Sequence, residues 1–170
     1  MQRSEQAIIN TGFFIAGPAT VVGLIPFLIT RWQFCRPLPG WIAARMVGAG
    51  LVAAGLVPLV SAVAEFAKAG GTPLPIAPPE RLVVSGFNRY VRNPMYVGVL
   101  VAIIGQALLF GNVRLLIHAA AMRAFFGAYV RWYEQPTLAR QFGAEYEAYQ
   151  RAVPGWLPRL RPWTPEPGVL

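Results

Sequence analysis

Long uncharged runs alternate with short polar connections along this chain. No charged residue occurs in Ala7–Thr30, Met46–Ala64 or Met95–Val113. At about 1.5 Å per residue, each run is long enough to cross a hydrocarbon core about 30 Å thick. A fourth apolar run, Leu115–Val130, is interrupted only by Arg123, and the short connection before it predicts a helical hairpin with the third run. The pattern predicts an all-α fold, an integral membrane helical bundle with about four transmembrane helices.

The connection between the second and third runs has a different character. Residues 69–79 are rich in glycine and proline, so they cannot form a helix and predict an extended loop on the cytoplasmic surface. This loop divides the chain in two. We expect a two-helix transmembrane scaffold in residues 1–68, and one integrated domain in residues 69–170 that holds the loop, the hairpin and a C-terminal helix.

The pattern after the fourth run predicts that further helix. Pro136 suits the first turn of a new helix. One side of this helix would carry apolar residues that recur at spacings of three or four, namely Leu138, Phe142, Tyr146, Tyr149 and Val153. We expect an amphipathic helix that lies at the membrane interface or covers a site. An ordinary helix that closes the bundle fits the same pattern.

Composition and charge support the membrane interpretation. Of the 170 residues, 55% are hydrophobic and only 13% are charged, which excludes an ordinary soluble domain. The formal net charge of +8 suggests nucleic-acid binding, but membrane topology explains the positions of the basic residues better. With four crossings and both termini in the cytoplasm, the cytoplasmic side holds Arg3, Lys68, Arg81, Arg89, Arg92, Arg131, Arg140, Arg151, Arg159 and Arg161. The outer side holds only Arg31, Arg36, Arg45 and Arg114, the bias that the positive-inside rule expects. We therefore expect membrane lipids as partners and no nucleic acid.

The most informative polar stretch stands directly before the third run. Asn93 is a favoured N-cap residue and Pro94 suits the first helical position, so a helix is predicted to begin at Pro94. The free N–H groups of this helix start, together with Arg89 and Arg92, would hold a carboxylate or a phosphate. The alternative is a basic flank that only sets the orientation of a transmembrane helix.

Other polar residues are isolated. His118 is the single histidine and Cys35 the single cysteine, so we expect no metal site. His118 is a candidate base or substrate contact, with a hydrogen-bonded structural histidine as the alternative. Arg123 is a candidate for binding a substrate carboxylate or headgroup, unless it only extends toward the interface. The glycines Gly48, Gly50 and Gly55 favour close helix packing over a dinucleotide fingerprint.

Several motifs together resemble one enzyme family. They are the Gly71-Thr72-Pro73 loop, Arg92-Asn93-Pro94-Met95-Tyr96-Val97-Gly98, Glu134-Gln135-Pro136, Phe142-Gly143-Ala144-Glu145-Tyr146 with Tyr149, and the stretch from Val153 to Arg159. In this order and spacing, residues 70 to 160 resemble the isoprenylcysteine carboxyl methyltransferase and phospholipid methyltransferase superfamily. The resemblance implies a multi-span enzyme of a bacterial cytoplasmic membrane that uses S-adenosylmethionine. It implies methyl transfer to the carboxylate or amine of a lipid or lipid-modified acceptor at the cytoplasmic face.

The resemblance and the chemistry of the residues together give the candidate site. The candidate cofactor contacts are Tyr90, Arg92, Asn93, Pro94, Tyr96, Gly98, Tyr133, Glu134 and Leu138. The candidate catalytic residues are His118, Arg123 and Glu134. A helix start with Arg92 suits the cofactor carboxylate, whereas Glu134 and the tyrosines suit its ammonium and sulfonium. The alternative for Glu134 is a cap on the following helix.

The chain departs from the family pattern at two positions. Asn93 stands where the isoprenylcysteine enzymes usually have histidine, and Gln135 replaces the second acid of a Glu-Glu pair. Gln135 keeps hydrogen-bonding capacity but loses a charge. Two other functions therefore stay open: an NADPH-dependent reductase on a related membrane fold, and a catalytically silent membrane assembly protein.

Overall fold

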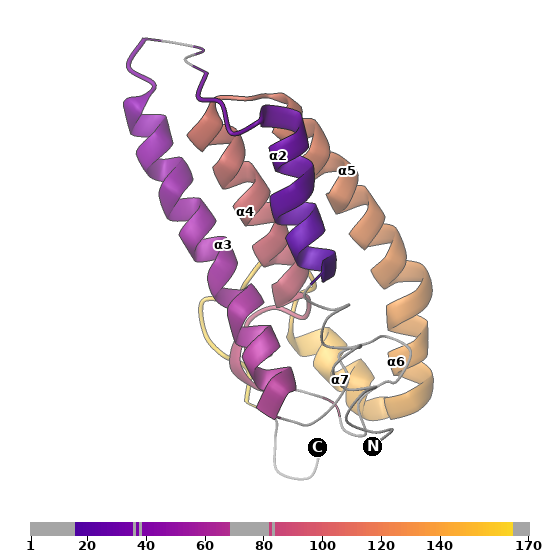
Figure 1. The fold of residues 1–170 in the computed structure, drawn as a ribbon. Coiled ribbons are helices and arrows are strands. Elements are labelled where there is room, and N and C mark those ends of the chain that lie inside the picture. The colour runs from indigo at the N-terminus through magenta and orange to yellow at the C-terminus, as the bar shows by residue number, and fades with distance from the viewer. Residues whose placement is uncertain (1–15, 36, 38, 69–81, 83, 165–170) are drawn as a thin grey trace. The chain divides into compact units, whose positions relative to one another are not determined.

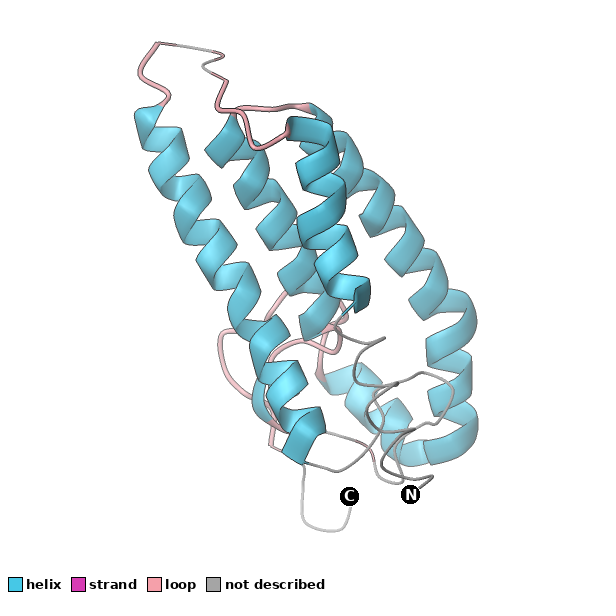
Figure 2. Cartoon of the chain, viewed as in Figure 1, coloured by secondary structure: helices cyan, strands magenta, loops and turns pink. Residues whose placement is uncertain are grey.

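The computed structural model of the chain describes residues 16–35, 37, 39–68, 82 and 84–164, and all secondary structure in this part is helical (Figures 1 and 2). The α-helices are α2 (Ile25–Thr30), α3 (Ile42–Lys68), α4 (Pro94–Phe110), α5 (Arg114–Tyr129), α6 (Gln135–Phe142) and α7 (Ala144–Ala152). Two π turns, η1 (Thr20–Leu24) and η3 (Val130–Glu134), and one 3₁₀ turn, η2 (Gly86–Arg89), complete the described elements. The predicted all-helical fold is confirmed. The loop with Gly71-Thr72-Pro73 and the start of the first apolar run lie outside the described residues.

The chain forms two compact units. The first comprises residues 1–73 and 95–125, and the second comprises residues 74–94 and 126–170. The boundaries fall at the start of α4 and near the end of α5, so each unit is assembled from separate stretches of chain. The predicted division between residues 68 and 69 stays a prediction.

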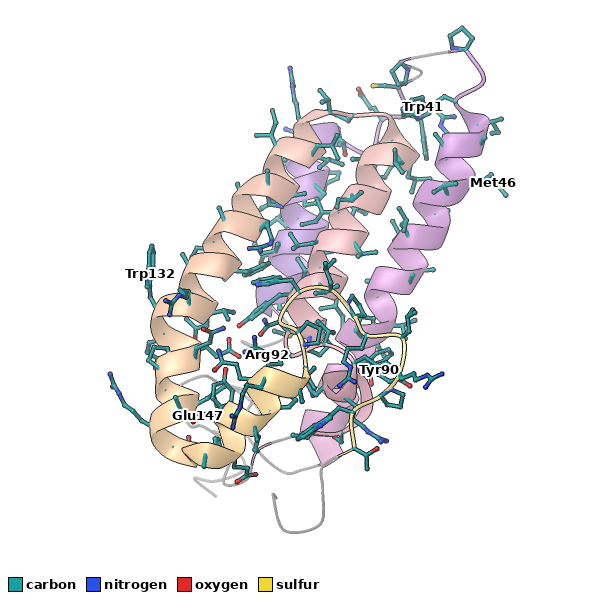
Figure 3. The ribbon with its side chains drawn as sticks, turned by 180° about the vertical axis from the view of Figure 1, so that it is seen from behind. Trp41, Met46, Tyr90, Arg92, Trp132 and Glu147 are labelled. Carbon is teal, nitrogen blue, oxygen red and sulfur yellow. The ribbon has the colours of Figure 1, made fainter. Side chains whose placement is uncertain are left out.

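The described helices give partial support for membrane crossing. Within the described residues, Ile42–Ser61 in α3 is the one stretch both long enough and apolar enough to span a membrane. Ala16–Thr30 and Pro94–Phe110 are apolar but shorter. Four transmembrane helices are therefore not established. Exposed side chains on α3, including Ile42 and Met46, are large and apolar, as expected of a helix surrounded by lipid (Figure 3).

Glycines bring α3 and α4 into backbone contact within the first unit. A Cβ atom added to Gly48 would lie 2.6 Å from the carbonyl oxygen of Gly105, and one added to Gly55 would lie 2.5 Å from that of Gly98. Gly48 and Gly55 on α3 are seven positions apart, and so are Gly98 and Gly105 on α4. Seven positions are about two helical turns, so both contacts lie on one side of each helix. Helix packing predicted for Gly48 and Gly55 is thus confirmed, whereas Gly50 contacts nothing at its Cβ position.

A π turn and a proline shape the first described helix. The N–H of Ile25 bonds to the carbonyl of Thr20, five residues back, and Pro26 has no N–H. The carbonyl of Val21 therefore has no donor at either position that a helix normally supplies, and that of Val22 loses its usual donor at Pro26. The side chains of two other helices replace these donors. Gln106 Nε2 donates to Val22 O at 2.8 Å, and His118 Nε2 lies 3.0 Å from Val21 O.

The second unit contains a similar turn. The N–H of Gln135 bonds to the carbonyl of Val130, five residues back, and Pro136 follows as the second residue of α6. Helical residues consequently continue from Arg114 to Phe142 without a break. Pro136 lies in the first turn of α6, as predicted, although the π turn joins α6 to α5. The wider turn accommodates the proline ring, which would otherwise clash with the carbonyl four residues earlier.

The predicted C-terminal helix is two helices with one shared apolar side. Gly143, with a φ of 52°, separates α6 from α7. Tyr146, Tyr149 and Val153 are nevertheless buried together, and Leu138 and Phe142 pack against them, as the spacing predicted. Leu82, Val84 and Trp163 also cover this cluster. The apolar side is therefore covered by the protein itself, and the interfacial position predicted for the helix loses the exposed apolar face on which it depended.

Candidate functional site

The segment before α4 is joined to the end of the chain within the second unit. We call residues 88–93 the signature segment and residues 153–164 the C-terminal segment. The N–H of Arg92 donates to Pro154 O, that of Arg159 to Tyr90 O, and that of Trp163 to Arg89 O, each at 2.9 Å. Backbone hydrogen bonds thus connect the two segments along most of their length, although residues 94–152 of the chain lie between them.

The polar side chains of the signature segment reinforce this connection. Arg92 Nε donates to Val153 O at 2.8 Å, and Asn93 Nδ2 donates to Gly155 O at 2.9 Å. Arg89 donates to Trp163 O and to Thr164 Oγ1, both at 2.8 Å. The Cβ position of Gly155 lies 3.4 Å from both side chains, so Gly155 is in ordinary van der Waals contact with them. These residues were predicted to hold an anion, and the structure gives each of them a structural bond as well.

Arg92 keeps donor capacity beyond that bond. Its NH1 atom lies 3.4 Å from the hydroxyl of Tyr146 on α7. In Figure 3, Arg92 lies beside α7, with Tyr90 and Glu147 on the same part of the second unit. A guanidinium has five N–H donors in a planar fork, so an anion can bind Arg92 without displacing its bond to Val153.

Two buried tyrosines support the signature segment from α7. The hydroxyl of Tyr149 donates to Asn88 O at 2.7 Å, and its ring packs against Trp163 with centroids 5.7 Å apart. Burial raises the pKa of Tyr149 above 10, and it also raises the pKa of Tyr146, with the positive charge of Arg92 opposing both shifts. Both hydroxyls are therefore neutral at physiological pH.

Glu134 brings a negative charge to the same unit. It is the last residue of the π turn η3 and is half-buried. Its carboxylate acts electrostatically on the hydroxyls of Tyr146 and Tyr149, with the effect of raising both pKa values. Its side chain makes no capping hydrogen bond to α6, so the alternative that Glu134 is only a helix cap is not supported. The second unit thus combines a cation, an acid and buried hydroxyls.

The remaining predicted contacts in this unit have varied surroundings. Pro94 begins α4, as predicted, and the carbonyl of Tyr90 accepts a bond from the C-terminal segment. Leu138 packs against the cluster around Tyr146 and Tyr149. Tyr133 is exposed, and its ring lies 5.3 Å from that of Tyr129, between centroids.

Comparison with known sequences assigns the chain to a family. The model of the phospholipid methyltransferase family matches residues 43–145. The chain belongs to this family. It is also similar to protein-S-isoprenylcysteine O-methyltransferase of Schizosaccharomyces pombe, with 36% identity over 80 residues. That alignment covers 46% of this chain and 34% of the relative, so the chain matches only about a third of the length of that protein. No solved structure matches the chain significantly.

The other candidate residues lie in the first unit. Gly98 contacts Gly55 and Pro58, where an added Cβ would lie 2.6 Å from the Gly55 carbonyl oxygen. Helix packing therefore explains this glycine, and the structure offers no support for a cofactor contact. His118 donates through Nε2, because the Val21 carbonyl can only accept. Its structural alternative is thus supported, and the catalytic role stays a prediction. Tyr96 is half-buried in the first turn of α4, and Arg123 is exposed on α5.

Sequence reasoning missed the contribution of Tyr146 and Tyr149 to the site. Both belong to the family-like motif beginning at Phe142, and both carry a hydroxyl on an otherwise apolar side. A buried hydroxyl needs a partner, which is the signal that identifies such residues. The partners themselves, Asn88 and Arg92, are more than 50 residues away and follow from no local rule.

Proposed function

We propose that this protein transfers a methyl group from S-adenosylmethionine to a lipid or lipid-modified acceptor in a membrane. Membership of the phospholipid methyltransferase family supports the reaction class. The observation that supports a site in this chain is the assembly of Arg92, Glu134 and Tyr146 within one compact unit. The S. pombe relative is a methyltransferase for isoprenylcysteine, which supports an acceptor that carries a lipid.

The chemistry of these side chains fits the proposed cofactor. S-Adenosylmethionine carries a carboxylate, an ammonium, a sulfonium and two ribose hydroxyls. The guanidinium of Arg92 suits the carboxylate, and Glu134 suits the ammonium or the ribose hydroxyls. When bound, the cofactor supplies an electrophilic methyl group. Gln135, which replaces the second acid of the family pair, still provides hydrogen bonds and leaves Glu134 as the charged residue.

The protein mainly has to align and shield the reacting groups. Methyl transfer is an in-line displacement that needs no covalent nucleophile, so orientation and exclusion of water contribute most. The hydrogen bonds between the signature segment and the C-terminal segment hold Arg92 in a fixed position for this purpose. A carboxylate acceptor needs no base, whereas an amine acceptor must lose a proton. Radiolabelled methyl transfer to an isoprenylcysteine analogue and to phosphatidylethanolamine distinguishes the two acceptors.

The proposal includes a membrane topology with four crossings and both termini in the cytoplasm. The bias in basic residues supports it, as does the apolar helix Ile42–Ser61. Cys35 is exposed and lies on the predicted outer side. In intact cells, an impermeant thiol reagent should label native Cys35. A Cys35→Ser, Ser85→Cys variant should be labelled only after permeabilisation, and labelling of Ser85→Cys in intact cells would contradict the topology.

Ligand titration tests the proposed function. Purified protein in detergent should bind S-adenosylmethionine in a calorimetric titration and should not bind NADPH. Binding of NADPH alone would favour the reductase, and binding of neither ligand would favour an assembly protein. In the last two cases the proposed methyltransferase function is wrong.

A further inference from the structure

One polar group near Glu134 has no role in the site described so far. The hydroxyl of Tyr129, at the end of α5, is buried and has no hydrogen-bond partner among the described residues. Buried hydroxyls in proteins are almost always paired, because an unpaired one loses its bonds to water without replacement. Such a group is readily tolerated where a bound molecule pairs with it.

The surroundings of Tyr129 belong to the same unit as the proposed site. Its ring packs against that of Tyr133, with centroids 5.3 Å apart and an angle of 31° between the planes. Glu134 interacts electrostatically with the Tyr129 hydroxyl. Tyr129 directly precedes the π turn η3, whose wider winding brings residues five apart nearer to one side of the helix, and Glu134 is five residues after Tyr129. The hydroxyl and the carboxylate therefore face a common region.

The chemistry of this pair selects the ligand group. A carboxylate only accepts hydrogen bonds, and it has several positions for them, so one bond within the protein does not exhaust Glu134. A tyrosine hydroxyl needs an acceptor for its proton. An ammonium would satisfy Glu134 but offer no acceptor to Tyr129. A ligand hydroxyl donates to the carboxylate and accepts from the tyrosine, so it satisfies both residues.

We propose that Tyr129 and Glu134 together bind a ribose hydroxyl of the methyl donor, with Tyr129 as the hydrogen-bond donor. This inference rests on the proposed function and adds a residue and a ligand group to it. Arg92 then binds the amino-acid end of the donor, and the end of α5 with η3 binds its ribose.

Tyr129→Phe tests this assignment, because it removes only the hydroxyl. The variant should bind S-adenosylmethionine about five-fold more weakly than wild type, as expected for one hydrogen bond. Its ligand-free melting temperature should be unchanged or higher, because an unpaired buried hydroxyl is removed. Tyr149→Phe is the matched control. It removes a hydroxyl that already bonds to Asn88 O, so it should lower the melting temperature.

Analogues of the donor that lack the 2′-hydroxyl or the 3′-hydroxyl identify the contact. One of them should bind wild type and Tyr129→Phe with equal affinity, because the bond is absent in both. Unchanged affinity of Tyr129→Phe for S-adenosylmethionine would refute the inference while leaving the proposed function intact. A lower melting temperature of Tyr129→Phe would also refute it, since the hydroxyl would then have a partner within the protein. No binding by wild type would refute the proposed function and this inference together.

Discussion

Two π turns, each followed by a proline, occur in the two units of this protein and have different surroundings. At the first, Thr20–Leu24, the side chains of Gln106 and His118 pair with the carbonyls that Pro26 leaves without a backbone donor. At the second, Val130–Glu134, the turn carries Glu134 and follows Tyr129, whose hydroxyl has no partner among the described residues. At the first π turn, side chains of the protein thus pair with the free carbonyls. Beside the second π turn, the hydroxyl of Tyr129 stays without a partner among the described residues.

The comparison indicates two different reasons for polar side chains in apolar helices. Gln106 and His118 are polar because the backbone of another helix needs donors. The buried hydroxyl of Tyr129, beside Glu134, has no such explanation within the described residues. We infer that Gln106 and His118 stabilise the fold of the first unit, whereas Tyr129 and Glu134 of the second unit bind the ligand. The predictions below test this division, beginning with the largest expected effect.

The packing of the first unit should be the most sensitive to substitution. Gly55→Ala places a Cβ atom against the backbone of α4 and should destabilise the protein by about 3 kcal/mol, at the upper end for overpacking. Gly50→Ala is the control, because nothing lies within 4 Å of its Cβ position. It should raise stability by up to about 1 kcal/mol. Thermal melting in detergent measures both, and equal behaviour of the two variants would contradict the close contact of α3 and α4.

Arg92→Ala should affect both stability and binding. It removes the charged donor to Val153 O, which should cost about 2 kcal/mol of stability. It also removes the proposed contact to the cofactor carboxylate, so affinity should fall about ten-fold. Asn93→Ala is the comparison, since it loses only the bond to Gly155 O. If calorimetry finds unchanged affinity for Arg92→Ala, the role of Arg92 is only to hold the C-terminal segment.

Gln106→Leu should change stability alone. The Val22 carbonyl would lose its donor in an apolar surrounding, which should cost about 1.5 kcal/mol. Affinity for S-adenosylmethionine should equal that of wild type. A clear loss of affinity in a variant of normal stability would place Gln106 in the ligand site and end the proposed division between the units.

Tyr149→Phe should have the smallest effect, about 1 kcal/mol near neutral pH, because one neutral hydrogen bond is lost. The pH dependence adds a second test. Burial raises the pKa of Tyr149 above its unfolded value of about 10, so the contribution of this group to stability is complete below that pH and is lost as the pH rises beyond it. Tyr149→Phe should therefore lose stability less steeply above pH ~10 than wild type. Parallel loss in both proteins would argue against a buried Tyr149.

Local rules predicted part of this structure well. The Asn-Pro pair correctly predicted that α4 begins at Pro94. The spacing of apolar residues correctly predicted the side of the helices that Leu138, Tyr146 and Val153 share. The break at Gly143 was missed, because the apolar spacing continues through it. A positive φ at this position breaks the helix there but leaves the apolar side aligned.

Long-range partners could not be predicted. Arg92 and Asn93 were expected to bind an anion, and their carbonyl partners at Val153 and Gly155 lie about 60 residues away in sequence. The sequence allows a catalytic or a structural role for His118, and the Val21 carbonyl beside its ring supports the structural role. In each case the local sequence identifies a polar group that needs a partner, and only the tertiary structure shows which partner it has.

Binding of S-adenosylmethionine by Glu134→Gln is the most direct test of the account. The substitution keeps the size of the side chain and removes its charge, and no capping bond to α6 is lost with it. The variant should melt close to the wild-type temperature and bind S-adenosylmethionine at least about ten-fold more weakly in a calorimetric titration. A folded Glu134→Gln protein that binds the cofactor as tightly as wild type would contradict the proposed ligand site in the second unit.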